Sequence, residues 1–86
     1  MDELKKARKE INAIDDKLLL LLTHRMKVVK KVGEYKIRNN MPIVDKKREK
    51  EVVEVLKGRA EELDLIPDQI AKIWKEIFKL AYEYEK

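Results

Sequence analysis

Several residue types are absent or rare in this 86-residue sequence, which has no cysteine, one histidine, two glycines and two prolines. The lack of cysteine excludes disulfide bonds, a thiolate nucleophile and a cysteine-based zinc site, and it makes a reducing, cytoplasmic setting the natural expectation. A histidine-based metal site is disfavoured as well, because His24 stands alone. We therefore expect neither a metal ion nor a cofactor.

Long apolar runs are also missing. The longest run spans residues 18–22, whereas a membrane-spanning helix needs about 20 apolar residues. The first ten residues, MDELKKARKE, lack the apolar core of a signal peptide. We therefore expect a soluble protein with no membrane partner.

Charged residues are abundant but nearly balanced, with 21 Lys and Arg against 17 Asp and Glu and a net charge of +4. The two signs are interleaved along the chain, which is typical of solvated helix faces first and of an anion preference second. A helical nucleic-acid-binding protein would instead gather its lysines on one outward face. We therefore expect a small anionic partner and no nucleic acid.

The apolar residues that are present recur with helical spacing, and no segment shows the alternation of a strand. An Asn-Asn-Met-Pro sequence ends the first helical segment, an aspartate is placed to cap the second, and a proline suits the first turn of the third. The sequence predicts an all-α fold in a single domain, residues 1–86. The three expected helices run from about Asp2 to about Asn39, from Asp45 to about Leu63, and from Pro67 onward.

The predicted first helix is too long for one small domain to cover. About 38 helical residues extend for about 57 Å, and later helices of about 18 residues reach only about 27 Å. A compact chain of this size has a radius of gyration near 12 Å. We therefore expect the uncovered apolar face to pack against its own copy in an intertwined, antiparallel homodimer.

A cation interrupts the apolar face of this helix. Arg25 stands in a column of apolar residues spaced by seven, namely Leu4, Ile11, Leu18 and Val32. Lys36 follows Arg25 by eleven residues, so the two side chains point within about 20° of each other, flanking Val28, Val29 and Val32. Glu49 heads the apolar stripe of the second helix, and Glu85 ends that of the third. The expected stripes consist of Val52, Val53, Leu56, Ala60 and Leu63 in the second helix and of Ile70, Ile73, Trp74, Ile77 and Ala81 in the third.

Two interpretations of these inward charges remain open. They could pair internally, Arg25 with Glu49 for example, or extend to solvent from the helix ends. Alternatively, an anionic ligand completes the site, because several uncompensated cations in one small core are costly. Arg8 lies about 25 Å from Arg25 along the same helix, too far to share one small ligand within a chain. An antiparallel partner would bring Arg8 of one subunit toward Arg25 and Lys36 of the other.

Four motifs, taken together, resemble the all-helical class of chorismate mutase. They are R-x-x-I-x-x-I-D from Arg8, the Arg25 and Lys36 pair, a short loop with Pro42, and D-x-x-R-E from Asp45, and the likeness continues through the tail IWKEIFKLAYEYEK. The resemblance implies an intertwined homodimer with two shared sites that converts the dianion chorismate to prephenate without a cofactor.

The resemblance also implies roles for individual residues. Arg25 and Arg8 of the other subunit would bind the two carboxylates, Lys36 would donate to the ether oxygen, and Glu49 would accept from the ring hydroxyl. The backbone N–H of Asp45 would contact that hydroxyl, with Arg48 as a supporting cation. The implied pocket wall consists of Val32, Val52, Phe78 and Tyr82. Ala81 and Glu85 depart from the commonest pattern, a small polar residue and Gln respectively, and Glu85 predicts activity that favours acid pH.

Three alternatives are weighed against this interpretation. An isochorismate-pyruvate lyase shares the scaffold and the cationic clamp but matches less well at Arg48 and Glu49. A basic helical binding module is disfavoured by the interleaved acidic residues. A structural coiled coil would place an aliphatic residue or a lone Asn at position 25 rather than an arginine.

Overall fold

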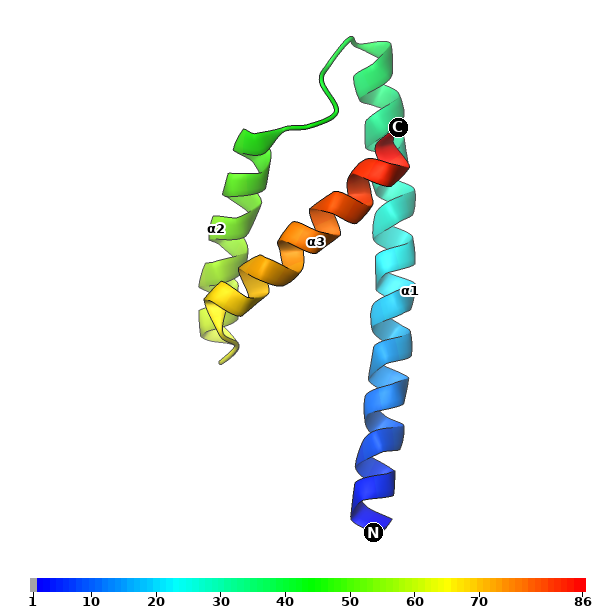
Figure 1. Ribbon diagram of the computed structural model, residues 1–86, viewed down its shortest axis with the longest axis vertical. Helices are drawn as coiled ribbons and strands as arrows, with labels where there is room; N and C mark the ends of the chain where they lie inside the picture. The colour runs from blue at the N-terminus through cyan, green and yellow to red at the C-terminus, as the bar shows by residue number, and fades with distance from the viewer. Residues whose placement is uncertain (1) are drawn as a thin grey trace.

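Three α-helices form the chain in its computed structural model, which describes residues 2–86 (Figure 1). They are α1 (Asp2–Arg38), α2 (Lys46–Glu62) and α3 (Pro67–Glu85), and no strand occurs within the described residues. The all-α class and the three predicted helices are thereby confirmed. α1 ends one residue before the predicted Asn39, because the chain turns there.

The helix ends follow from local sequence. The Asp45 side chain accepts a hydrogen bond from the Arg48 backbone N–H at 3.0 Å, as predicted for the cap of α2. Pro67 lies in the first turn of α3, where its missing N–H costs nothing. After α1 and α2, the chain passes through left-handed residues, Asn40 (φ 53°) and Asp64 (φ 60°). Asn and Asp tolerate this region better than most other residues, so both helices end without a glycine.

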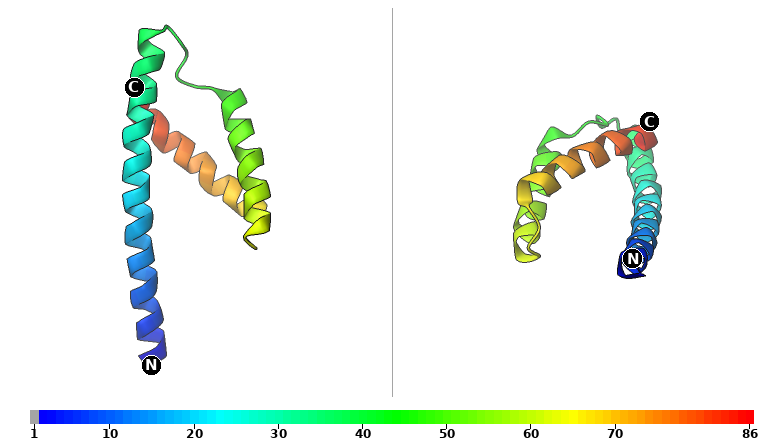
Figure 2. Two further views of the ribbon diagram at one scale, coloured as in Figure 1. Left: turned by 180° about the vertical axis from the view of Figure 1, so that it is seen from behind. Right: turned by 60° about the horizontal axis from the view of Figure 1, so that its bottom comes forward.

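α3 joins the other two helices, since it packs against α2 and against α1, whereas α1 and α2 make no mutual contact within residues 2–86. The result is an arch with α1 and α2 as its legs and α3 as the bridge, seen most clearly in the right-hand view of Figure 2. The radius of gyration is 16.2 Å, against about 12 Å for a compact chain of this length. A single chain therefore leaves the inside of the arch open.

The core of the single chain is small. Its buried apolar residues among those described are Met26, Ala60, Phe78 and Ala81. Every residue from 2 to 21 is exposed, although this part of α1 carries three aliphatic side chains of the predicted apolar column, Leu4, Ile11 and Leu18. Two residues of the predicted inward stripes, Leu63 and Ile73, are each 51 % exposed. That part of the stripe prediction is wrong for the isolated chain, because no element of the same chain covers these positions.

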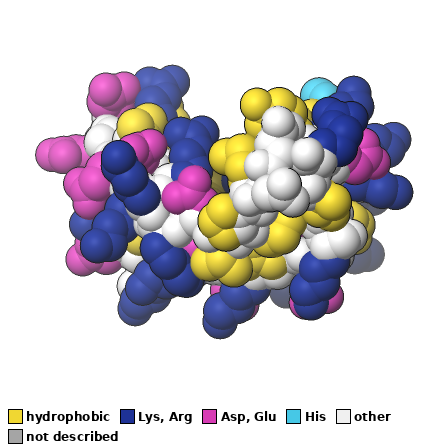
Figure 3. Space-filling model, turned by 90° about the horizontal axis from the view of Figure 1, so that it is seen from above, with side chains coloured by type: hydrophobic (Ala, Val, Ile, Leu, Met, Phe, Trp, Pro, Cys, Tyr) yellow, Lys and Arg dark blue, Asp and Glu magenta, His cyan; other side chains and the backbone are white. Residues whose placement is uncertain are grey.

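Apolar and charged side chains are distributed unevenly over the molecule. In the end-on view of Figure 3, apolar side chains gather on the α1 side, while Lys, Arg, Asp and Glu intermingle on the α2 side. None of the described helices is both long enough and apolar enough to cross a membrane. Exposed apolar residues lie on all three helices and also in the two loops, with Met41 and Val44 before α2 and Leu65 and Ile66 before α3.

Candidate active site

A cavity of about 350 Å³ lies where the three helices face one another, within the size range of ordinary small-molecule sites. Every site residue predicted from the sequence lines this cavity except Arg8. The valine wall of α1 is completed by Val28 and Val29. The full lining comprises Arg25, Val28, Val29, Val32, Lys36, Asp45, Arg48, Glu49, Val52, Phe78, Ala81, Tyr82 and Glu85.

Arg25 brings an uncompensated cation to the cavity. Its Nη1 atom is buried and has no hydrogen-bond partner among the described residues. The internal pairing of Arg25 with Glu49 that the sequence left open is not formed in this part of the chain. Burying a guanidinium nitrogen without a hydrogen-bond acceptor costs free energy of folding. This nitrogen is therefore available to donate a hydrogen bond to a ligand.

Lys36 lies deeper at the end of the same wall. Its Nζ donates to the Ile43 backbone carbonyl at 2.8 Å and to the Glu85 carboxylate, with Nζ–Oε1 at 3.2 Å. The side chains of Lys36 and Glu85 are only 13 % and 8 % exposed. An ammonium carries three donors, so Lys36 joins α1, the loop before α2 and the end of α3 at one point of the cavity.

Tyr82 holds Glu49 across the α2–α3 contact, where the phenol hydroxyl donates to Glu49 Oε2. Lys46 Nζ lies 3.5 Å from the same oxygen. Burial raises the pKa of Tyr82 to about 12, aided by the hydrogen bond and the charge of Glu49 and opposed by a hydrogen bond from the Asp45 backbone. Tyr82 is therefore a neutral donor at ordinary pH. The sequence placed it only as a wall residue, because a contact between residues 33 positions apart leaves no local pattern.

The remaining predicted residues form the rim and the wall. Arg48 is an exposed cation whose Nη1 lies 4.0 Å from Glu51 Oε2, and Asp45 sits beside it at the helix start. Phe78 and Ala81 are buried in α3. No cluster of three or more potential metal ligands occurs among residues 2–86.

Arg8 lies outside the cavity. It occupies the exposed N-terminal half of α1, about 25 Å from Arg25 along the helix axis. The single chain therefore brings together Arg25, Lys36 and Arg48 but leaves the fourth predicted cation apart from them.

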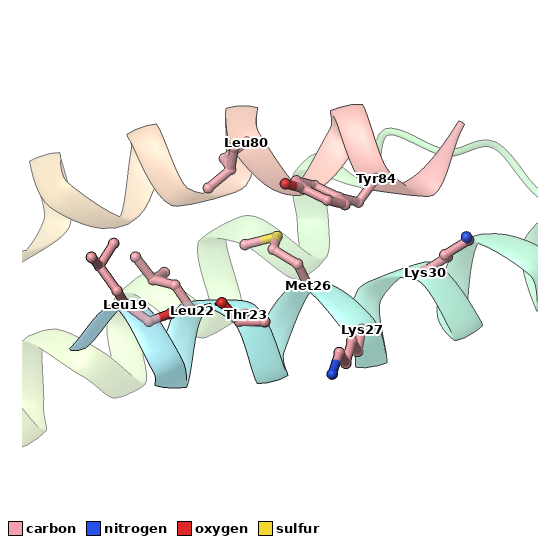
Figure 4. Close-up of a pocket in the computed structure, with 8 residues that line it drawn as sticks. All are labelled: Leu19, Leu22, Thr23, Met26, Lys27, Lys30, Leu80 and Tyr84. Atoms are coloured by element: carbon pink, nitrogen blue, oxygen red, sulfur yellow. Dashed lines mark hydrogen bonds between the residues drawn. The ribbon is translucent and has the colours of Figure 1, made fainter. Parts of the chain in front are cut away.

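A second groove of about 420 Å³ runs between α1 and the last turns of α3. Figure 4 shows Leu19, Leu22 and Met26 on α1 lying opposite Leu80 and Tyr84 on α3. Lys27 and Lys30 are its charged residues. We place the site in the smaller cavity, because only there do acidic and basic side chains converge on a buried, unpaired donor.

The fold and the cavity define a small all-helical protein with a pocket in which three basic and three acidic side chains meet around the buried, unpaired Nη1 of Arg25. Residues 7–86 match the family model described as chorismate mutase type II. The chain therefore belongs to the chorismate mutase type II family, which confirms the resemblance seen in the sequence.

Three relatives illustrate this membership. The chain is 37 % identical to a bifunctional chorismate mutase/prephenate dehydratase of Aquifex aeolicus, and 34 % identical to the T-protein of Enterobacter agglomerans. Those alignments cover 100 % and 96 % of this chain but only 25 % and 22 % of the relatives, so the chain spans about a quarter of their length. A chorismate mutase of Methanocaldococcus jannaschii is 30 % identical, with 100 % of this chain and 83 % of that protein covered. No solved structure gives a significant match.

Proposed function

We propose that this chain is a chorismate mutase, an isomerase that rearranges chorismate to prephenate on the route to phenylalanine and tyrosine. The observation that carries the proposal is the buried, unpaired Nη1 of Arg25 in a cavity that also holds Lys36 and Arg48. A carboxylate of a dianionic ligand would supply the acceptor that Arg25 Nη1 lacks. Membership of the chorismate mutase type II family supports the same substrate.

The reaction is a unimolecular rearrangement in which one carbon–oxygen bond breaks while a carbon–carbon bond forms. A protein accelerates it by holding the flexible substrate in a compact conformer and by stabilising charge that develops on the ether oxygen. Side chains that clamp carboxylates and a shaped apolar wall supply the first effect. A fixed cation at the ether oxygen supplies the second.

The residues of the cavity are assigned accordingly. Arg25 binds one carboxylate, since a guanidinium can form two parallel hydrogen bonds with it. Lys36 donates to the ether oxygen and Glu49 accepts from the ring hydroxyl, with the Asp45 backbone N–H on the same hydroxyl. Arg48 adds positive charge at the rim, and the valine wall with Phe78, Ala81 and Tyr82 shapes the apolar side.

We propose further that the chain works as an intertwined antiparallel homodimer. A compact monomer of this mass exposes about 5,400 Å², whereas this chain exposes 7515 Å². The excess of about 2,000 Å² per chain suits an obligate homodimer interface. Apolar residues on the uncovered part of α1, including Ile11, Leu18 and Leu21, are 54 %, 54 % and 64 % exposed. An antiparallel α1 of a second copy would cover these exposed residues.

This assembly also places the missing cation. The length of α1 separates Arg8 from its own cavity, but reversing a second α1 brings Arg8 of the partner subunit toward Arg25. Each site then holds a guanidinium for each carboxylate of the substrate, Arg25 for one and the partner subunit's Arg8 for the other, besides Arg48 at the rim.

The direct test mixes purified protein with chorismate and follows the loss of chorismate absorbance while identifying the product. We expect prephenate. Release of pyruvate from isochorismate, with no prephenate from chorismate, would support the lyase alternative instead. Sedimentation equilibrium of the same sample tests the dimer, and a monomer at micromolar concentration would contradict the shared site.

A further inference from the structure

The two glycines of the chain have very different surroundings. A Cβ atom built on Gly33 would lie 2.5 Å from the Glu85 backbone oxygen and 2.7 Å from its Cα. A Cβ built on Gly58 would meet no atom within 4 Å. Neither glycine has a positive φ, so conformational freedom is not the reason for Gly33. Its distinguishing property is the absence of a side chain where α3 crosses α1.

The crossing is a backbone-to-backbone contact. Figure 1 shows the C-terminal end of α3 lying directly on α1, and Gly33 and Glu85 are both buried there. A glycine within a helix costs about 1 kcal/mol relative to alanine. The close contact between α3 and α1 explains why a glycine is present at this position despite that cost. The atoms in the way belong to the backbone, so no side-chain rotation could accommodate a methyl group.

This contact determines where the carboxylate of Glu85 lies. Gly33 precedes Lys36 by one helical turn on the same face of α1. The Glu85 oxygens lie 3.2 and 3.4 Å from Lys36 Nζ, near the outer limit of a hydrogen bond. Relieving a contact at Gly33 requires the last turn of α3 to retreat by about 1 Å, since nonbonded atoms prefer separations near 3.5 Å. That retreat is enough to separate the carboxylate from the ammonium.

We propose that Gly33 is a positioning residue that acts through Glu85. Its bare backbone seats the last turn of α3 so that the Glu85 carboxylate reaches Lys36 at the end of the cavity. Gly33 itself does not line the cavity. The consequence for catalysis rests on the proposed mutase activity, whereas the consequence for the ion pair does not.

The first test measures the ion pair without substrate. A double-mutant cycle of Lys36→Met and Glu85→Gln gives the coupling free energy between the two side chains when the free energy of unfolding of each variant is measured. We expect favourable coupling in the wild-type chain and in the matched control Gly58→Ala. In Gly33→Ala the coupling should be lost. Unchanged coupling in Gly33→Ala overturns the proposal, whatever the enzyme does with chorismate.

The second test separates positioning from general destabilisation. Gly33→Ala meets the backbone of residue 85, so it should lower the melting temperature in both wild type and Glu85→Ala, and by more in wild type, where the coupling to Lys36 is lost as well. Its effect on kcat should differ, with a change of about tenfold or more in wild type and almost none in Glu85→Ala. Equal effects on kcat in both backgrounds contradict the proposal.

A third variant leaves the contact between α1 and α3 at Gly33 unchanged. Glu85→Asp shortens the side chain by one methylene, so the carboxylate should lose its coupling to Lys36 although Gly33 is retained. Retained coupling in Glu85→Asp shows that the reach of the carboxylate is not critical, and it overturns the proposal even if Gly33→Ala is too unstable to study. A Gly33→Ala chain that does not fold also counts against it, because Gly33 would then support the whole fold rather than one carboxylate. If wild type converts no chorismate, the proposed function fails and the unfolding cycle still decides the role of Gly33.

Discussion

Lys36 Nζ lies within hydrogen-bond distance of both carboxylate oxygens of Glu85, across 49 residues of sequence. The pair joins the last turn of α1 to the last turn of α3 at one end of the cavity. The ammonium proposed to stabilise the ether oxygen is therefore held in place by residues of its own chain. Such a cation reorganises little when charge develops on a ligand.

Replacement of Lys36 tests that role most directly. Lys36→Met keeps most of the side-chain length and removes the charge. Because the charge on the ether oxygen develops in the transition state, kcat should fall by about 10²–10³ with a smaller change in KM. Steady-state kinetics on chorismate would show it. A kcat within a few-fold of wild type would remove Lys36 from this role.

Most of this site could be predicted from sequence because helical geometry is regular. The eleven-residue spacing of Arg25 and Lys36 was enough to place both on one face, and both line the cavity. The cap at Asp45 and the proline at the start of α3 were equally readable, since each depends on a few adjacent residues.

Contacts between helices were harder to predict. The bond from Tyr82 to Glu49 and the crossing of Gly33 with Glu85 depend on how α3 lies across α1 and α2. Only the glycine left a trace in the sequence, as an unfavourable residue in a long helix. The exposed positions of Leu63 and Ile73 were missed because periodicity identifies an apolar face but does not say whether the same chain covers it.

Tyr82→Phe should disturb Glu49 without removing it. Loss of the phenol hydroxyl frees Glu49 Oε2 from α3 and leaves the carboxylate to Lys46. We expect kcat/KM to fall by about tenfold, a typical cost for a hydrogen bond to a charged group. Tyr84→Phe is the matched control, since Tyr84 is 47 % exposed. Equal kinetics in the two variants would mean that Tyr82 does not position Glu49.

The raised pKa of Tyr82 predicts that wild type and Tyr82→Phe differ in how their stability depends on alkaline pH. The pKa of Tyr82 is raised from 10.0 to about 12 in the folded chain, so above pH 10 the unfolded chain releases a proton that the folded chain retains. The contribution of Tyr82 to the free energy of unfolding is therefore complete below pH 10 and is lost as pH rises toward 12. Relative to wild type, Tyr82→Phe should gain stability over this interval in thermal melts. A wild-type curve parallel to that of Tyr82→Phe would contradict the raised pKa.

Subunit mixing tests the shared site. Arg8→Ala and Arg25→Ala should each be nearly inactive as homodimers, because each removes one carboxylate clamp from both sites. A heterodimer of the two contains one intact site, since Arg8 and Arg25 of a single site come from different chains. Refolding the two variants together should restore about half of the wild-type activity per heterodimer. If tagged subunits exchange and the mixture stays inactive, the two arginines do not act across the interface.

Glu85→Gln tests the position at which this chain departs from the commonest family pattern. An amide donates a hydrogen bond to the ether oxygen, whereas a carboxylate repels the charge that develops there. The Glu85 side chain faces Lys36 and is 8 % exposed, so it is not in solvent where its charge would be screened. Glu85→Gln should therefore raise kcat. The measurement is kcat on chorismate for both proteins under the same conditions. Equal values of kcat would show that Glu85 does not act at the ether oxygen, and Glu83→Gln, a neighbouring exposed residue, controls for the change in net charge.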